Sequence, residues 1–123
     1  MSSLHNDVFD NGLSVIDDNT ENLYICSAEP TTFAEASTDY KLGTKATPAI
    51  AAPSDRGAGG REVVVAAITD GSVGITGTAT HYALTDDSAS ALIAAGSLGA
   101  TQLVTTGNTF TLTSFAIGIP DPA

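Results

Sequence analysis

Residues 80–100, THYALTDDSASALIAAGSLGA, hold the densest group of side chains in this chain that could do chemistry. Histidine, aspartate and serine together are the residue types of a nucleophilic site. However, His81 lies in a run typical of an extended strand, where each residue adds about 3.3 Å, so Asp86 is expected more than about 15 Å away. No G-x-S-x-G elbow precedes Ser88 or Ser90. We interpret Asp86, Asp87 and Ser88 as a hairpin turn, and His81 as a cross-strand contact.

Other candidate sites lack the residues or the spacing that their chemistry requires. DDNTE at 17–21 offers alternating oxygen ligands for calcium but lacks the glycine and distal glutamate of an EF-hand. His5 and His81 have no cysteine partners at zinc spacing. GAGG at 57–60 has no following lysine and opens no helix, as a phosphate loop would. Cys26 lies in an apolar run and is expected to be a buried, inert thiol. The sequence therefore predicts no catalytic, cofactor-binding or metal site.

The charge distribution is strongly asymmetric. The net charge is −10, and the four basic residues, Lys41, Lys45, Arg56 and Arg61, precede a stretch from Glu62 onward without lysine or arginine. Nucleic acids and anionic membranes both require a basic footprint, so neither is an expected partner. An acidic, threonine-rich surface suits docking to a basic patch of another protein.

Length and composition indicate one domain, residues 1–123. Apolar residues make up 42% and charged residues 15% of the chain, which argues against disorder and against a helical bundle. With one cysteine, no internal disulfide is possible. The first ten residues lack the basic and apolar regions of a signal peptide, and no apolar run approaches the roughly 20 residues of a membrane span. We expect synthesis and folding in a cytoplasm.

The first half of the chain is expected to contain one helix, one strand and one long loop. Residues 3–17 have helical spacing, and the helix and its turn should occupy residues 1–20. Its apolar side chains are Leu4, Val8 and Val15 with Gly12 on one face, and Phe9, Leu13 and Ile16 beside them. A strand at 22–27 opens the region 22–61, and residues 30–61 are rich in proline and glycine. We predict an extended, irregular excursion there.

Residues 61–123 have the pattern of an antiparallel β-region. The expected strands are 61–69, 72–86, 91–98, 101–106 and 109–120, with turns at Asp70–Gly71 and Gly107–Asn108. Short strands joined by turns, with no helices between them, favour a mainly β fold. The prediction is an antiparallel β-sandwich or jelly-roll-like domain with a short N-terminal helix and a long irregular loop.

Three stretches of the chain carry a resemblance. They are NGLSVIDDNTENLYICSAEPTTFAEASTDYKLG, REVVVAAITDGSVGITGTATHYALTDDSASALIAAGSL and VTTGNTFTLTSFAIGIPDP. Together they resemble small virion structural proteins of tailed bacteriophages. The resemblance implies a non-enzymatic virion component, made in the host cytoplasm. Its implied role is that of a capsid decoration or cement protein, a homo-oligomer and preferably a trimer, bound to the major capsid protein across subunit junctions or to other virion proteins.

Two alternatives stay open at the level of the sequence. One is a head–tail connector or a tail- or fibre-associated structural protein. The other is a small jelly-roll hydrolase or carbohydrate-binding module that uses His81, Asp86 and Asp87. For the virion reading, the apolar helix face or the 28–61 segment is expected to supply the partner interface. Its candidate residues are Leu4, Val8, Phe9, Phe33, Tyr40, Lys41, Lys45, Arg56 and Arg61.

Overall fold

The computed structural model describes residues 6–121, with side chains from Asp10 onward. It contains one α-helix, α1 (Asn6–Asn19), a π-helical turn, η1 (Glu35–Asp39), and a 3-10 turn, η2 (Asp87–Ala89). The strands are β1 (Asn22–Cys26), β2 (Lys41–Ala46), β3 (Ser54–Asp55), β4 (Arg61–Val65), β5 (Ile68–Val73), β6 (Gly77–Asp86), β7 (Ala91–Val104), β8 (Thr109–Leu112) and β9 (Phe115–Ile119). The predicted mainly β, antiparallel fold with one N-terminal helix is confirmed.

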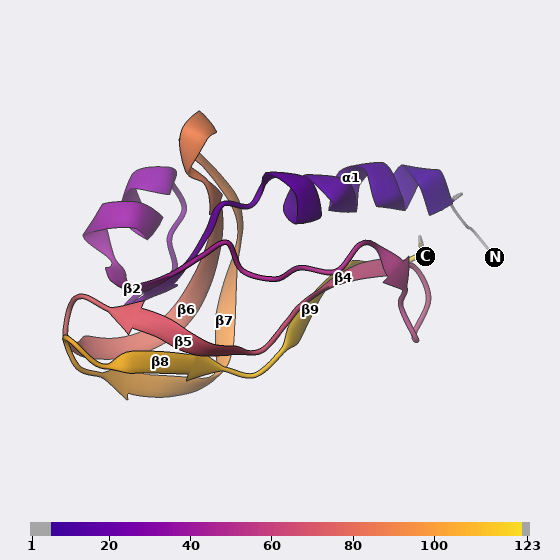
Figure 1. Ribbon diagram of the computed structural model, residues 1–123. Helices are drawn as coiled ribbons and strands as arrows, with labels where there is room; N and C mark the ends of the chain where they lie inside the picture. Colours follow the sequence, from indigo (N-terminus) through magenta and orange to yellow (C-terminus); the bar gives the residue numbers. More distant parts are fainter. Residues whose placement is uncertain (1–5, 122–123) are drawn as a thin grey trace.

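Six strands form one curled sheet, a half-barrel, in the order β7-β6-β1-β2-β5-β8 (Figure 1). All neighbours are antiparallel, and β1 lies at the centre between β2 and β6. Alternation along β1 sends Leu23 and Ile25 to the inner face and Tyr24 and Cys26 to the outer face. All four are buried, because the curl encloses the inner face and η1 covers the outer one.

A smaller sheet, in the order β3-β4-β9, continues from the edge of the large one. β4 leads into β5 through Ala66 and Ala67, and β8 leads into β9 through Thr113 and Ser114. Since β4 pairs with β9 and β5 with β8, the two extended stretches form one antiparallel ribbon that kinks between the sheets. The predicted strands 61–69 and 109–120 are therefore each two strands, which belong to different sheets.

The principal core lies inside the curled sheet. It contains Leu23, Ile25, Leu42, Val65, Ile68, Val73, Ala79, Leu84, Val104, Phe110 and Leu112. Helix α1 packs over the small sheet (Figure 1). Leu13 is buried there against Val63, and Ile16 is half-buried. Val15, expected on the apolar face, is instead 46% exposed, because the helix turns Leu13 and Ile16 toward the sheet. No helix in the described part of the chain is long and apolar enough to cross a membrane.

Three glycines lie opposite large side chains on neighbouring strands of the curled sheet. Gly71 pairs with Phe110, and a Cβ at Gly71 would overlap the phenyl ring. Gly96 pairs with Tyr82, whose Oη would lie 2.8 Å from such a Cβ. Gly43 pairs with Ile25 in the same way. Each large side chain thus lies across the space that a β-carbon would fill, which lets neighbouring strands curl around the core.

Two predictions of secondary structure are wrong. Residues 41–46, placed in the irregular excursion, form β2 in the middle of the large sheet. Asp70–Gly71, predicted as a turn, lies within β5. The glycine that suggested a turn is required there by the ring of Phe110.

In the C-terminal half, one predicted turn is confirmed and one predicted division between strands is wrong. The predicted turn at Gly107–Asn108 is confirmed: Gly107 has a φ of 89°, and Asn108 N donates a hydrogen bond to Thr105 O at 3.0 Å. Segments 91–98 and 101–106 were predicted as separate strands. They belong instead to one strand, β7, which ends at Val104.

Replacement of Gly71 tests the role of the glycine contacts. We expect Gly71→Ala to lower the free energy of unfolding by about 1–3 kcal/mol, because the methyl group overpacks against Phe110. Gly74→Ala is the matched control, since no heavy atom lies within 4 Å of a Cβ at that position. Chemical denaturation of both variants measures the difference. Equal stability of the two variants would contradict the packing role of Gly71.

Candidate functional site

The aspartates and serines of residues 86–90 form a hydrogen-bonded hairpin tip. Asp87 begins η2, and its carboxylate accepts hydrogen bonds from Tyr24 Oη and from Thr85 Oγ1, both at 2.6 Å. Burial acts to raise the pKa of Asp87, but the hydrogen bonds from Thr85 and Tyr24 together lower it. Thr85 is fully buried, so Asp87 satisfies a polar group of the core.

A second carboxylate fastens the same hairpin to the start of β1. Glu21 accepts from Ser88 N at 2.6 Å and from Ser88 Oγ at 3.0 Å, and these bonds lower its pKa. Asp86 caps η2 by accepting from Ala89 N at 3.3 Å. The hydrogen bond between the Asp86 and Glu21 side chains raises the pKa of Asp86. The predicted turn at Asp86–Ser88 is confirmed.

His81 and Cys26 do not meet this cluster through any hydrogen bond. The His81 ring contacts Thr80 Oγ1 at 2.8 Å through Nδ1 and Ser97 Oγ at 3.4 Å through Nε2, which fits the predicted cross-strand role. Cys26 is buried as predicted, and burial raises the pKa of its thiol to about 11. Within residues 6–121 as described, no three His, Cys, Asp or Glu side chains are grouped to hold a metal ion.

Three of the four basic residues have separate local contacts. The Lys41 ammonium lies 5.6 Å from the centre of the Tyr24 ring. Lys45 forms an ion pair with Asp70 at 3.0 Å on the neighbouring strand β5. Arg56 Nη1 donates to Gly59 O at 2.9 Å, which closes the loop between β3 and β4.

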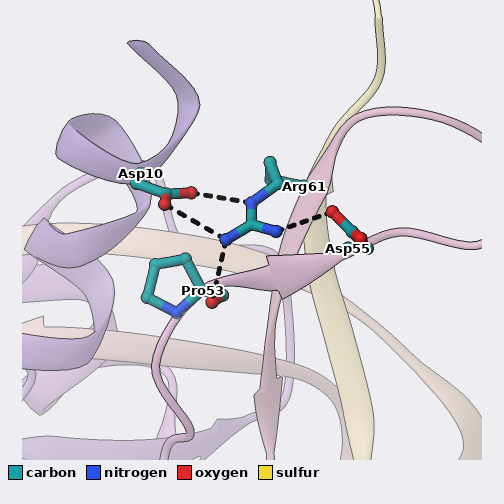
Figure 2. Close-up of polar contacts among 4 residues, drawn as sticks. All are labelled: Asp10, Pro53, Asp55 and Arg61. Atoms are coloured by element: carbon teal, nitrogen blue, oxygen red, sulfur yellow. Dashed lines mark hydrogen bonds and ion pairs between the residues drawn. The ribbon is translucent and has the colours of Figure 1, made fainter. Parts of the chain in front are cut away.

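Arg61, the fourth basic residue, joins three segments of the chain (Figure 2). Its Nε and Nη2 donate to the two carboxylate oxygens of Asp10 on α1, at 2.9 and 3.1 Å. Nη1 donates to Asp55 at 2.6 Å, and Nη2 also reaches Pro53 O at 3.3 Å. The side chain is only 15% exposed. Arg61, a candidate partner residue, is placed to hold α1 against the small sheet.

Of the five remaining candidates for the partner interface, two have described side chains and three do not. Phe33 and Tyr40 flank η1 and are half-buried, and Tyr40 packs against the outer face of the sheet. Thr31 and Glu35 fix this segment, with Thr31 N and Oγ1 donating to Glu35 at 2.8 and 2.7 Å. Val8 and Phe9 lie within α1, but their side chains are not described, and Leu4 lies outside the described residues.

A β-bulge of four residues in β7 is the main irregularity of the large sheet. Ala79 pairs with Gln102 and His81 with Ser97, so Thr80 alone faces the four residues 98–101. These four residues have no ladder partner on β6, and Gly99 and Ala100 are exposed. Bulges of this kind re-aim side chains and often accompany functional sites.

The bulge forms one wall of a cleft between the two free edges of the sheet. β7 is the last strand on one side and β8 on the other, and Gln102 Nε2 spans the gap to Thr111 O at 2.5 Å. The cleft has a volume of about 440 Å³, within the range of small ligand and peptide pockets. Its lining includes Tyr82 and Phe115, whose ring centres lie 4.4 Å apart. No lining residue is charged.

Strands β7, β8 and β9 all come from a stretch without ionisable side chains. From Ser88 to Pro120 the sequence has no Asp, Glu, Lys, Arg or His, although the chain carries a net charge of −10. We call the surface formed by these three strands the uncharged surface. Sequence reasoning missed the cleft and the bulge. The available signal was the absence of charged residues from Ser88 to Pro120. Placing this stretch at the edges of the sheet required the strand order, which the sequence alone does not give.

Comparison of the chain with models of protein families, with curated proteins and with solved structures finds no match.

The carboxyl pair at the hairpin tip makes a prediction about pH. We expect Glu21→Gln to lower the pKa of Asp86, because the hydrogen-bonded partner that raises it is changed. NMR titration of the Asp86 carboxyl carbon measures this directly. Since its folded pKa is raised, Asp86 favours the folded state at acidic pH and loses that contribution as the pH rises through the raised pKa. An unchanged Asp86 pKa in the variant would contradict the pairing.

The ion pairs of Arg61 make a prediction about stability. We expect Asp10→Asn to lower the midpoint of thermal unfolding, because the mostly buried guanidinium loses its bidentate carboxylate partner. Asp70→Asn is the control, since Asp70 pairs with Lys45 at an exposed position where an ion pair contributes little. Calorimetry that finds the two variants equally stable would remove the assigned role of Arg61.

Proposed function

We propose that the protein is a non-enzymatic structural component of a tailed-bacteriophage virion, and specifically a capsid decoration or cement protein. The resemblance of three long stretches of the sequence to small virion proteins supports the placement in a virion. The observation that carries a binding role is the uncharged surface, which contains both free edges of the large sheet. Soluble proteins usually protect such edges with charges, prolines or short strands.

The proposed mechanism is stabilisation by preferential binding. A protein that binds the assembled shell more tightly than free subunits shifts the equilibrium toward the shell by mass action. In this proposal the β8–β9 side of the uncharged surface contacts a capsid subunit across the junction. Its edge presents unpaired backbone groups beside the cleft, which suit an extended segment of a partner. The acidic side chains elsewhere would steer the encounter.

In this proposal the fold is the predicted sandwich with one of its two layers shortened. The curled sheet is the main layer, and the small sheet with α1 covers one of its ends. We propose that this arrangement is a variant of the sandwich and jelly-roll group, with one layer shortened to leave the cleft open.

Binding to particles tests the proposed function. We expect the purified protein to cosediment with assembled capsids that lack it, and imaging to place it on subunit junctions. Thr113→Lys puts a charge in the cleft at an exposed position and should weaken this binding. Thr38→Lys, an exposed threonine of η1 outside the uncharged surface, is the matched control.

The pattern of binding decides between placements. Density confined to one vertex or to the tail would reassign the protein to the connector or tail. Absence of binding to any particle would overturn the virion proposal. Equal binding by the Thr113 and Thr38 variants would show that capsids bind at another surface.

A further inference from the structure

The strand β7 is an edge strand without the usual protection against pairing. It is 14 residues long and contains no charged residue and no proline. Its described backbone pairs only with β6, so its other edge has no strand partner, and only the Gln102 side chain reaches from it to β8. Long, uncharged edges of this kind are templates for association with another chain, unless the protein covers them.

Side chains on the second half of β7 add an apolar contact to this open backbone. Leu103 is 87% exposed, the largest exposed fraction among the large apolar residues of the described chain. It follows Gln102, which lines the cleft, and successive side chains of a strand point to opposite faces. Leu103 therefore protrudes on the face of β7 opposite to the cleft, beside the open backbone edge.

We infer that β7 of a second copy of this chain covers this edge, in a two-fold symmetric contact centred on the second half of the strand. A two-fold contact applies the same patch twice, so two copies of β7 would pair edge to edge and bring their Leu103 side chains together near the axis. The contact also covers the unpaired backbone groups of the bulge, which have no partner on β6.

The charge distribution identifies a second copy as the partner. Two chains of net charge −10 repel each other wherever their acidic regions meet. The uncharged surface is the region where two copies can approach without bringing ionisable side chains of the contacting strands together. A basic partner would instead be drawn to the acidic residues, which lie outside Ser88–Pro120. The remaining repulsion acts at longer range, and salt screens it beyond about 10 Å at 0.1 M.

This inference concerns the same surface as the proposed function but assigns it a different partner, and it leaves the β8–β9 side free for the capsid. It is tested without particles, so its failure and the failure of the virion proposal are distinguishable. Loss of self-association leaves particle binding to be measured separately.

Sedimentation equilibrium of the full chain tests the contact from micromolar to submillimolar concentration. We expect a monomer–dimer equilibrium that strengthens as the salt concentration rises. Leu103→Lys should remove the dimer over the same range, because two lysines would face each other in an apolar contact. Val15→Lys replaces another exposed apolar side chain, on α1, and should dimerise like the unchanged protein. Circular dichroism verifies that both variants are folded.

Three results would overturn the inference. They are a wild-type chain that stays monomeric throughout the range, a Leu103→Lys variant that dimerises as well as the Val15→Lys variant, and a discrete trimer in place of the dimer. A trimer, the form that the resemblance implies, would require pairing between different edges, such as β7 with β8 of the next copy, and not the two-fold contact proposed here.

Discussion

The placement of large side chains across cross-strand glycines determines the shape of this molecule. Phe110 over Gly71, Tyr82 over Gly96 and Ile25 against Gly43 let neighbouring strands wrap around the core without steric overlap. The six strands therefore curl, and the curl encloses one principal core. It stops short of a closed barrel, because β7 and β8 approach without pairing and only the Gln102 side chain spans the gap. The cleft and the open edges are consequences of this incomplete closure.

Several ionisable side chains hold α1, the short strand β3 and the β6–β7 hairpin tip in place, and Lys45 and Asp70 link β2 and β5. Arg61 ties α1 and the segment before β4 to the small sheet, and Glu21 and Asp87 tie the β6–β7 hairpin to β1. These contacts lie outside β7, β8 and β9, which carry no ionisable residue. The chain thus separates a polar, internally fastened part from an uncharged part with open edges. This separation is the physical basis for proposing that the uncharged part contacts other proteins.

Much of the fold followed from local pattern, and the errors came from interactions that local pattern does not contain. Helix α1, β1, the Asp86–Ser88 turn and the Gly107–Asn108 turn were predictable from spacing and turn residues. Strand β2 was missed because it contains Gly43 and is followed by Pro48, and its partners β1 and β5 are distant in sequence. Asp70–Gly71 was misassigned because the glycine serves a ring on another strand. The cleft depends on which strands end the sheet, and that order emerges only from tertiary pairing.

In the arrangement that we propose, protein covers the edge of β7 in the functional state. Amide hydrogen exchange, followed strand by strand in dilute and in concentrated protein, tests this claim most directly, because exchange reports which backbone groups gain hydrogen-bonded protection. We expect slower exchange in the second half of β7 on association, while η1 and β2, which lies three strands from β7 in the sheet order, keep their rates. Unchanged exchange in β7, with protection appearing at η1 or α1 instead, would contradict it.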